Sequence, residues 1–259
     1  MGDMRGCGVF PSGSSGDNAH MGKDGVPNGW NGTVVEGRDP YALKRDCNAS
    51  SRIWLHDFAR KRPTSMELHG FDISLDQVGP KPWVPANTNF HTWDIFGEPP
   101  SQFVGYFDVV HVRLITVVVK NNDPRPILSS LAKLLKPGGY LQWDEVDTIG
   151  CSIKTVPSTS APSLEKITSQ LKGNDTWKYD LTGIMEENGH SNPKLHTFEY
   201  GLDMARFWND VYISTWKEFA DHVLKMPEVT RKLEQDGLDE ARRGAATMVP
   251  KLVWVAQKV

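Results

Sequence analysis

Acidic side chains follow three segments of this chain that have the residue pattern of β-strands. Asp72 ends residues 67–73, Asp94 follows residues 89–93, and Asp144 with Glu145 follows residues 140–143. A carboxylate after one strand can accept hydrogen bonds from both hydroxyls of a ribose, and a carboxylate after the next can accept one from an adenine amine. In this order the acids indicate a nucleoside pocket. The alternative is that aspartate is simply common at strand ends and turns.

The elements that must position these acids alternate between strands and helices. Residues 53–60 have helical spacing and stop before Pro63, residues 107–113 form a further strand, and residues 127–135 carry a helical apolar face. That helix ends at Lys136-Pro137-Gly138-Gly139, where proline stops it and the glycines permit a tight turn into the next strand. This alternation predicts an α/β fold with a doubly wound, mostly parallel sheet, in which ligands bind at the carboxyl ends of the strands.

The C-terminal part fits the same scheme less clearly. Its pattern predicts helices over residues 179–188, 204–224 and 228–243, and strands over residues 195–202 and 251–256. In the second helix Trp208, Tyr212 and Trp216 recur at every fourth residue, which indicates a core stripe. A further hypothesis is that part of this helix caps an apolar substrate.

Composition limits the partners. Among 259 residues the net charge is −3 and the isoelectric point is about 6.2, so no nucleic-acid partner is expected. The longest apolar run, residues 114–119, is too short to cross a membrane. The three cysteines form no CxxC pair and the eight histidines have no metal-ligand spacing, so we expect neither a disulfide framework nor a metal site. A small-molecule substrate and a cytoplasmic location fit these features.

Two regions differ in composition. Residues 1–40 are rich in Gly, Ser, Asn and Asp and contain few residues able to build a core. They predict a disordered leader. The remaining residues, 41–259, are expected to form the folded domain.

In combination, several motifs resemble one fungal family. They are YALKRD (41–46), ELHGFDIS (67–74), WDIF (93–96), FDVVHVR (107–113), KNNDPRPIL (120–128), LLKPGGYLQWDEVD (134–147), ARFW (205–208) and LVWVAQK (252–258). They are similar to those of class I S-adenosylmethionine (SAM)-dependent methyltransferases of secondary metabolism, akin to the LaeA regulator and to gliotoxin-type N-methyltransferases. The resemblance covers residues 41–258.

The resemblance implies a Rossmann-like fold, SAM as the cofactor and methylation of an oxygen or nitrogen atom of a small secondary metabolite. It implies that Asp72 binds the ribose, that Asp94 and Ile95 flank the adenine, and that residues 109–113, including Val110, line the methionine end. His111 is a candidate general base, although a single histidine on a strand is more often structural. No metal is implied.

The chain departs from the family directly before residue 53. There the family has a strand and a GTGTG-like loop, whereas Asn48 to Arg52 run straight into Ile53. Gly13 and Gly16 have no predicted strand before them. The first strand and the glycine loop are therefore expected to be missing, which would leave the neighbouring strands without a partner. Either a splicing or gene-model deletion or a true degenerate paralogue would explain this.

Two other functions remain to be weighed. A catalytically impaired relative could act as a regulator or scaffold, with a protein partner and a nuclear location. An NAD-dependent dehydrogenase would also use an acid after its second strand, but it requires a GxGxxG motif, which the sequence lacks. It also gives no role to Asp94.

Overall fold

A seven-stranded sheet forms the larger part of the molecule in the computed structural model, which describes residues 5–9, 52–61, 66–76, 78–172, 175–223 and 227–259. The strand order is β3-β2-β1-β4-β5-β9-β7. The strands are β1 (Arg5–Val9), β2 (Glu67–Asp72), β3 (Thr88–Thr92), β4 (Phe107–Arg113), β5 (Leu135–Val146), β7 (His190–Phe198) and β9 (Lys251–Lys258). The first five are parallel, and β9 runs antiparallel to both β5 and β7. The predicted α/β fold with a mostly parallel sheet is confirmed.

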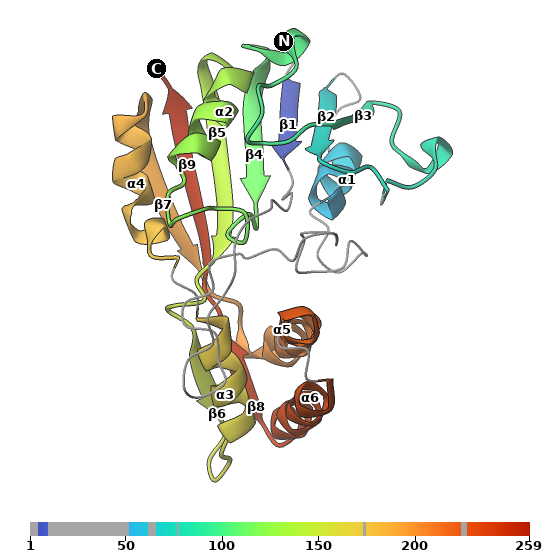
Figure 1. Ribbon diagram of the computed structural model, residues 1–259, viewed down its shortest axis with the longest axis vertical. Coiled ribbons are helices and arrows are strands. Elements are labelled where there is room, and N and C mark those ends of the chain that lie inside the picture. Colours follow the sequence, from blue (N-terminus) through green and yellow to red (C-terminus); the bar gives the residue numbers. More distant parts are fainter. Residues whose placement is uncertain (1–4, 10–51, 62–65, 77, 173–174, 224–226) are drawn as a thin grey trace.

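Helices cover both faces of this sheet. Helix α1 (Arg52–Lys61) packs through Leu55 and Ala59 on Leu68 of β2. Helices α2 (Arg125–Leu134) and α4 (Trp177–Glu187) pack on the opposite face, where the largest hydrophobic cluster lies. We call these the α1 face and the α2 face. The seven strands with α1, α2 and α4 make up the sheet body (Figure 1).

The sequence of α2 explains why it forms and which side it buries. Ile127, Leu128, Leu131 and Leu134 recur at helical spacing and are fully buried. Burial of each such side chain contributes about 1.5–3 kcal/mol. The first residues of β5 need their glycines: Gly138 has φ +76°, and a Cβ on Gly139 would lie 3.0 Å from the carbonyl oxygen of Lys136. The predicted KPGG turn is thus an irregular segment at the start of β5, where the register with β4 shifts.

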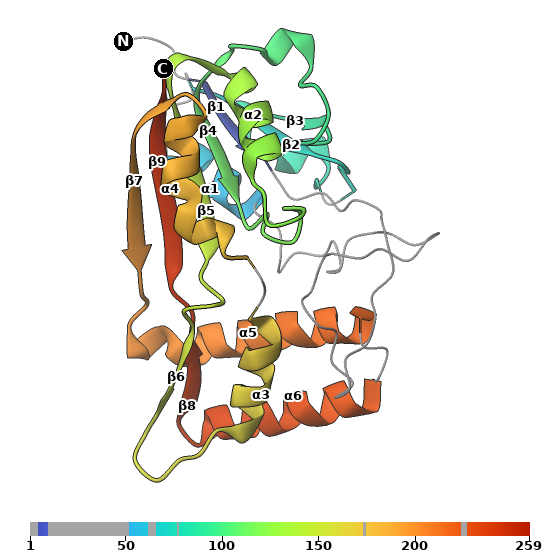
Figure 2. The same cartoon turned by 60° about the vertical axis from the view of Figure 1, so that its left-hand side comes forward.

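A second, smaller group of elements lies beyond the carboxyl end of the sheet and was not expected from the sequence. It comprises the antiparallel pair β6 (Ser152–Thr155) and β8 (Ala245–Met248) with helices α3 (Pro162–Leu171), α5 (Leu202–Val223) and α6 (Pro227–Arg242). We call it the small unit. It has its own hydrophobic core, which includes Leu164, Ile213 and Trp216. Figure 2 shows α5 and α6 stacked below the sheet body.

The centre of the sheet corrects one expectation. Strand β1 lies between β2 and β4, with five register pairs to β2 and four to β4. From the sequence, Arg5–Val9 were expected in a disordered leader and the centre of the sheet was expected to be empty, whereas the structure has these five residues there as β1. The physical reason is that the N–H and C=O groups of β2 and β4 need partners, which β1 supplies. The remainder of the expected leader, residues 10–40, and residues 41–51 lie outside the described part.

Candidate functional site

The carboxyl ends of the parallel strands meet at one edge of the sheet, which we call the ligand edge. Figure 1 shows β1 and β4 pointing toward the small unit. The register places Asp72, the last residue of β2, opposite Thr92 of β3, so that Asp94 follows two residues beyond. The two predicted acids therefore lie at the ends of adjacent strands, beside the end of β1. Gly13 and Gly16 are outside the described residues, but a strand now precedes them.

The two acids differ in exposure. Asp72 is half-buried, and its Oδ1 accepts a hydrogen bond from the backbone N–H of Ser74 at 3.2 Å. Asp94 is exposed, and its Oδ1 accepts the N–H of Phe96 at 3.0 Å, which fixes a tight turn. Within the described part of the chain, Oδ2 of Asp94 has no hydrogen-bond partner. This oxygen is available to a donor such as an amine.

Two other predicted cofactor residues turn away from the ligand edge. Val110 is 0 % exposed and Ile95 is 1 % exposed, and both belong to the hydrophobic cluster of the α2 face. The Val110 side chain packs in this core, so its predicted role at the cofactor rests on its backbone. Ile95 can contribute only its backbone, because its side chain lies in the same core.

His111 takes part in a buried polar network on the α1 face. Its Nε2 lies 3.4 Å from Oδ2 of Asp144, and Nζ of Lys251 on β9 lies 2.8 Å from the same oxygen. Gln142 donates to the other oxygen of Asp144 at 2.9 Å. Side chains from three strands thus contact the carboxylate of Asp144, and these contacts join the ends of β4, β5 and β9.

The charges in this network follow from burial and pairing. Burial lowers the pKa of His111, although the nearby Asp144 opposes the shift. Burial also acts to raise the pKa of Asp144, but hydrogen bonds from His111, Lys251 and Gln142 outweigh it and hold this pKa well below its usual range. His111 is therefore a neutral, 2 % exposed ring beside an ionised carboxylate. It is suited to positioning β4 more than to taking a proton from a bound molecule.

Glu145 serves the segment that follows β4. It is 1 % exposed, on the α2 face, and burial raises its pKa. Its Oε1 accepts the backbone N–H of Ile115 at 2.9 Å, and its Oε2 accepts the hydroxyl of Thr116 at the same distance. Leu114, just before, has φ +53°. Glu145 therefore fixes the path of the chain where it leaves the ligand edge, a role that the sequence did not reveal.

The aromatic stripe of α5 divides between two environments. Trp216 is 1 % exposed, lies in the core of the small unit and donates from Nε1 to Gln170 at 2.8 Å. Trp208 and Tyr212 are half-buried and their ring centroids lie 6.2 Å apart, with Tyr200 beside Trp208 at 5.9 Å. The core interpretation holds for Trp216. The hypothesis that this helix caps a substrate applies only to the half-buried pair.

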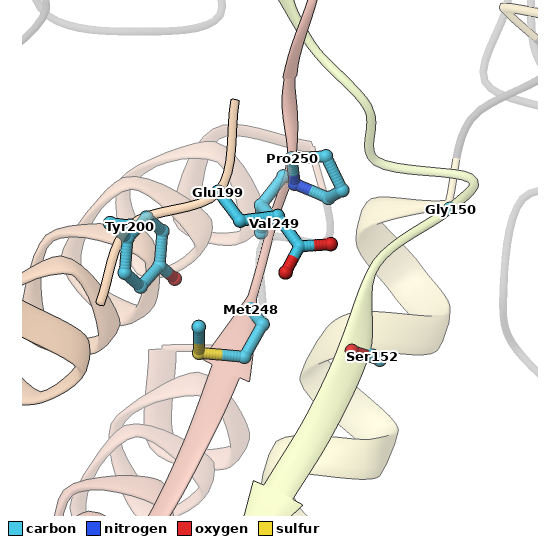
Figure 3. Close-up of a pocket in the computed structure, with 7 residues that line it drawn as sticks. All are labelled: Gly150, Ser152, Glu199, Tyr200, Met248, Val249 and Pro250. Carbon is cyan, nitrogen blue, oxygen red and sulfur yellow. The ribbon is translucent and has the colours of Figure 1, made fainter. Parts of the chain in front are cut away.

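A small pocket lies where the chain passes between the sheet body and the small unit. Figure 3 shows the residues that line it: Gly150, Ser152, Glu199, Tyr200, Met248, Val249 and Pro250. They come from the connections β5 to β6, β7 to α5 and β8 to β9, and from the adjoining ends of β6 and β8. The hydroxyl of Tyr200 donates to the carbonyl of Thr247 at 2.6 Å, which fixes this junction. None of the predicted site residues line the pocket.

Two kinds of site find no support in the described residues. No cluster of three or more histidine, cysteine, aspartate or glutamate side chains in this part of the chain could hold a metal ion. None of the described helices is long and apolar enough to cross a membrane.

Comparisons with known proteins agree with this fold. No protein-family model matches the chain. It is 26% identical over 192 residues to methyltransferase grgD of a Penicillium species, covering 68% of this chain and 66% of that protein. It is 28% identical over 204 residues to N-methyltransferase verN of Clonostachys rogersoniana, covering 76% of this chain and 69% of that protein. The chain thus spans about two thirds of the length of these relatives.

The solved structures show the fold alone. The chain matches the crystal structure of the [4+2]-cyclase SpnF with a TM-score of 0.51 and 14% identity, over 100% of this chain and 76% of the other. Because that protein is named as a cyclase, the shared fold does not by itself specify the reaction. The chain is thus similar in sequence to two fungal proteins named as a methyltransferase and an N-methyltransferase, and its sheet order fits the α/β fold that the sequence predicted.

Proposed function

We propose that this chain is a SAM-dependent methyltransferase that methylates an oxygen or nitrogen atom of a small molecule. The observation that carries the proposal is the pair Asp72 and Asp94 at the ends of adjacent strands, beside the end of β1. Two of the relatives are named as a methyltransferase and an N-methyltransferase, and these names support the same reaction. That the acceptor of the whole protein is a small molecule is also part of this proposal.

The residues present fit the nucleoside part of SAM. The carboxylate of Asp72 would accept hydrogen bonds from the ribose hydroxyls. Oδ2 of Asp94, which has no hydrogen-bond partner among the described residues, would accept one from the adenine amine. The backbone of Ile95 would flank the base. When bound, SAM supplies an electrophilic methyl group on a sulfonium sulfur.

Methyl transfer to an oxygen or nitrogen lone pair requires mainly that the two reactants be held in line. The chain's contribution is therefore positioning. Glu145 holds the segment after β4 through Ile115 and Thr116. His111, neutral and bonded to Asp144, holds the end of β4. We assign His111 a positioning role. The proton of the acceptor passes to water, or the acceptor has a pKa low enough to react in its unprotonated form.

Calorimetric titration tests the cofactor assignment. The full chain is expected to give saturable heat with SAM, and Asp72→Ala is expected to weaken binding about a hundredfold, because hydrogen bonds to a charged group each contribute about 1.5–3 kcal/mol. Asp76→Ala is the matched control, since Asp76 is exposed and four residues away. No heat up to about millimolar SAM, with the chain shown to be folded, would exclude the enzyme assignment.

A second function is favoured by one specific observation. The sequence has no GxGxG motif before α1 or elsewhere, although the family uses such a loop to let the backbone approach the cofactor. A regulatory or scaffold relative would keep the fold without cofactor binding and would use a protein partner. The same titration separates the two, because the scaffold function predicts a folded chain that is silent toward SAM.

A further inference from the structure

We propose that Arg113 is an anion-binding residue that receives the α-carboxylate at the amino-acid end of the cofactor. This inference rests on the proposed function and assigns a residue to a part of the ligand that Asp72 and Asp94 do not reach. It is carried by the lack of an ion-pair partner for Arg113 among the residues that the structure describes, and by its place in the sheet.

Arg113 is the last residue of β4 and is half-buried. Its Nε is buried and has no hydrogen-bond partner, and the guanidinium forms no ion pair with any residue that the structure describes. A guanidinium stays charged at any physiological pH and presents five donors. Leaving a buried donor of a charged group unsatisfied costs free energy, so this position favours an anionic partner.

The nearest acid on the neighbouring strand does not serve as that partner. Asp144 is opposite Arg113 in the β4–β5 register, but its two oxygens are bonded to His111, Lys251 and Gln142. The network already contains one cation, Lys251, for the one carboxylate. Because His111 is neutral and Lys251 balances the charge of Asp144, no described carboxylate balances the positive charge of Arg113 at this end of the ligand edge.

The register places Arg113 level with Asp72. Gly70, Gly8 and His111 form one row across β2, β1 and β4, and Asp72 and Arg113 each stand two residues beyond that row. Side chains two residues apart on a strand share a face, so both lie on the α1 face. They flank the carboxyl end of β1 from opposite sides, where the strand order of this sheet reverses.

The separation suits one kind of ligand. Two strand spacings set the backbones of Asp72 and Arg113 about 10 Å apart. A carboxylate at one side accepts hydroxyl donors, and a guanidinium at the other binds a carboxylate in bidentate fashion. A molecule that carries a ribose at one end and an amino-acid carboxylate at the other meets both requirements across β1.

Calorimetry with two related probes tests the assignment directly. The probes are SAM and decarboxylated SAM, which keeps the nucleoside, the sulfonium and the amine but lacks the carboxylate. Arg113→Gln is expected to weaken SAM binding by about ten- to a hundredfold and to change the affinity for decarboxylated SAM by less than about twofold. Arg60→Gln, at an exposed arginine in the last turn of α1, is the control for the loss of charge.

Each outcome decides the inference. Equal weakening of both probes would show a general structural effect, and unchanged SAM binding would show that Arg113 has another role; either overturns the proposal. A loss of activity with unaltered SAM affinity would indicate that Arg113 binds a carboxylate of the acceptor molecule and not that of SAM. This outcome would overturn the proposal as well. If the unaltered chain binds neither probe, it is the proposed function that fails.

Discussion

Removal of residues 1–9 tests whether β1 really forms the centre of the sheet. This strand makes five register pairs with β2 and four with β4. Each pair in a parallel ladder corresponds to about one backbone hydrogen bond, and each bond contributes a net 0.5–1.5 kcal/mol, roughly. The truncation should therefore cost about 5–13 kcal/mol, which is comparable to the whole stability of a typical domain.

The assay is thermal and denaturant unfolding followed by circular dichroism. The chain without residues 1–9 is expected to lack a cooperative transition, whereas a chain without residues 1–4 keeps β1 and should melt like the full chain. The single change Cys7→Pro should also destabilise strongly, because proline removes a donor in a central strand. A truncated chain that unfolds cooperatively at an unchanged temperature would refute the placement of β1 and restore the disordered leader.

Two further predictions concern stability. Burial lowers the pKa of His91, His111 and His190, so their neutral rings stabilise the fold above about pH 6.5. This stabilisation is lost as the pH falls below that value, because the unfolded chain then binds protons that the native chain does not. Melting temperatures should decline between about pH 6.5 and about pH 5; a rise on acidification would contradict this. A Cβ on Gly70 would lie 2.5 Å from the ring of Phe90, so Gly70→Ala should destabilise by about 1–3 kcal/mol and Phe90→Leu should recover part of it in denaturant unfolding; no recovery would place the strain elsewhere.

Much of the sheet body could be predicted from local patterns in the sequence. The apolar face of α2 depends on neighbouring residues and formed where the sequence predicted it, whereas the KPGG segment lies within β5 and not before it. The acids at the ends of β2 and β3 lie together because parallel strands share an edge, which the pattern also implied. The inward direction of the Val110 side chain follows from the alternation of faces along β4, since His111 and Arg113 share the opposite face.

Features that depend on distant residues could not be predicted. Arg5–Val9 contains two glycines and no apolar alternation, so it becomes a strand only because β2 and β4 present unpaired backbone on both sides. The bonds of Asp144 to His111 and Lys251 join residues far apart in the sequence. The small unit was missed because β6 and β8 are short and pair with each other across α3 to α6.

The small unit is interleaved with the sheet body along the chain. Strand β6 and helix α3 come first, then α4 and β7 return to the sheet body, and α5, α6 and β8 complete the small unit before β9 returns again. It therefore cannot be expressed alone as one continuous fragment or exchanged between relatives by a single crossover. Recombination that altered this unit would have to replace two separate segments and preserve β7 between them, so change in this region is expected to proceed by point substitution.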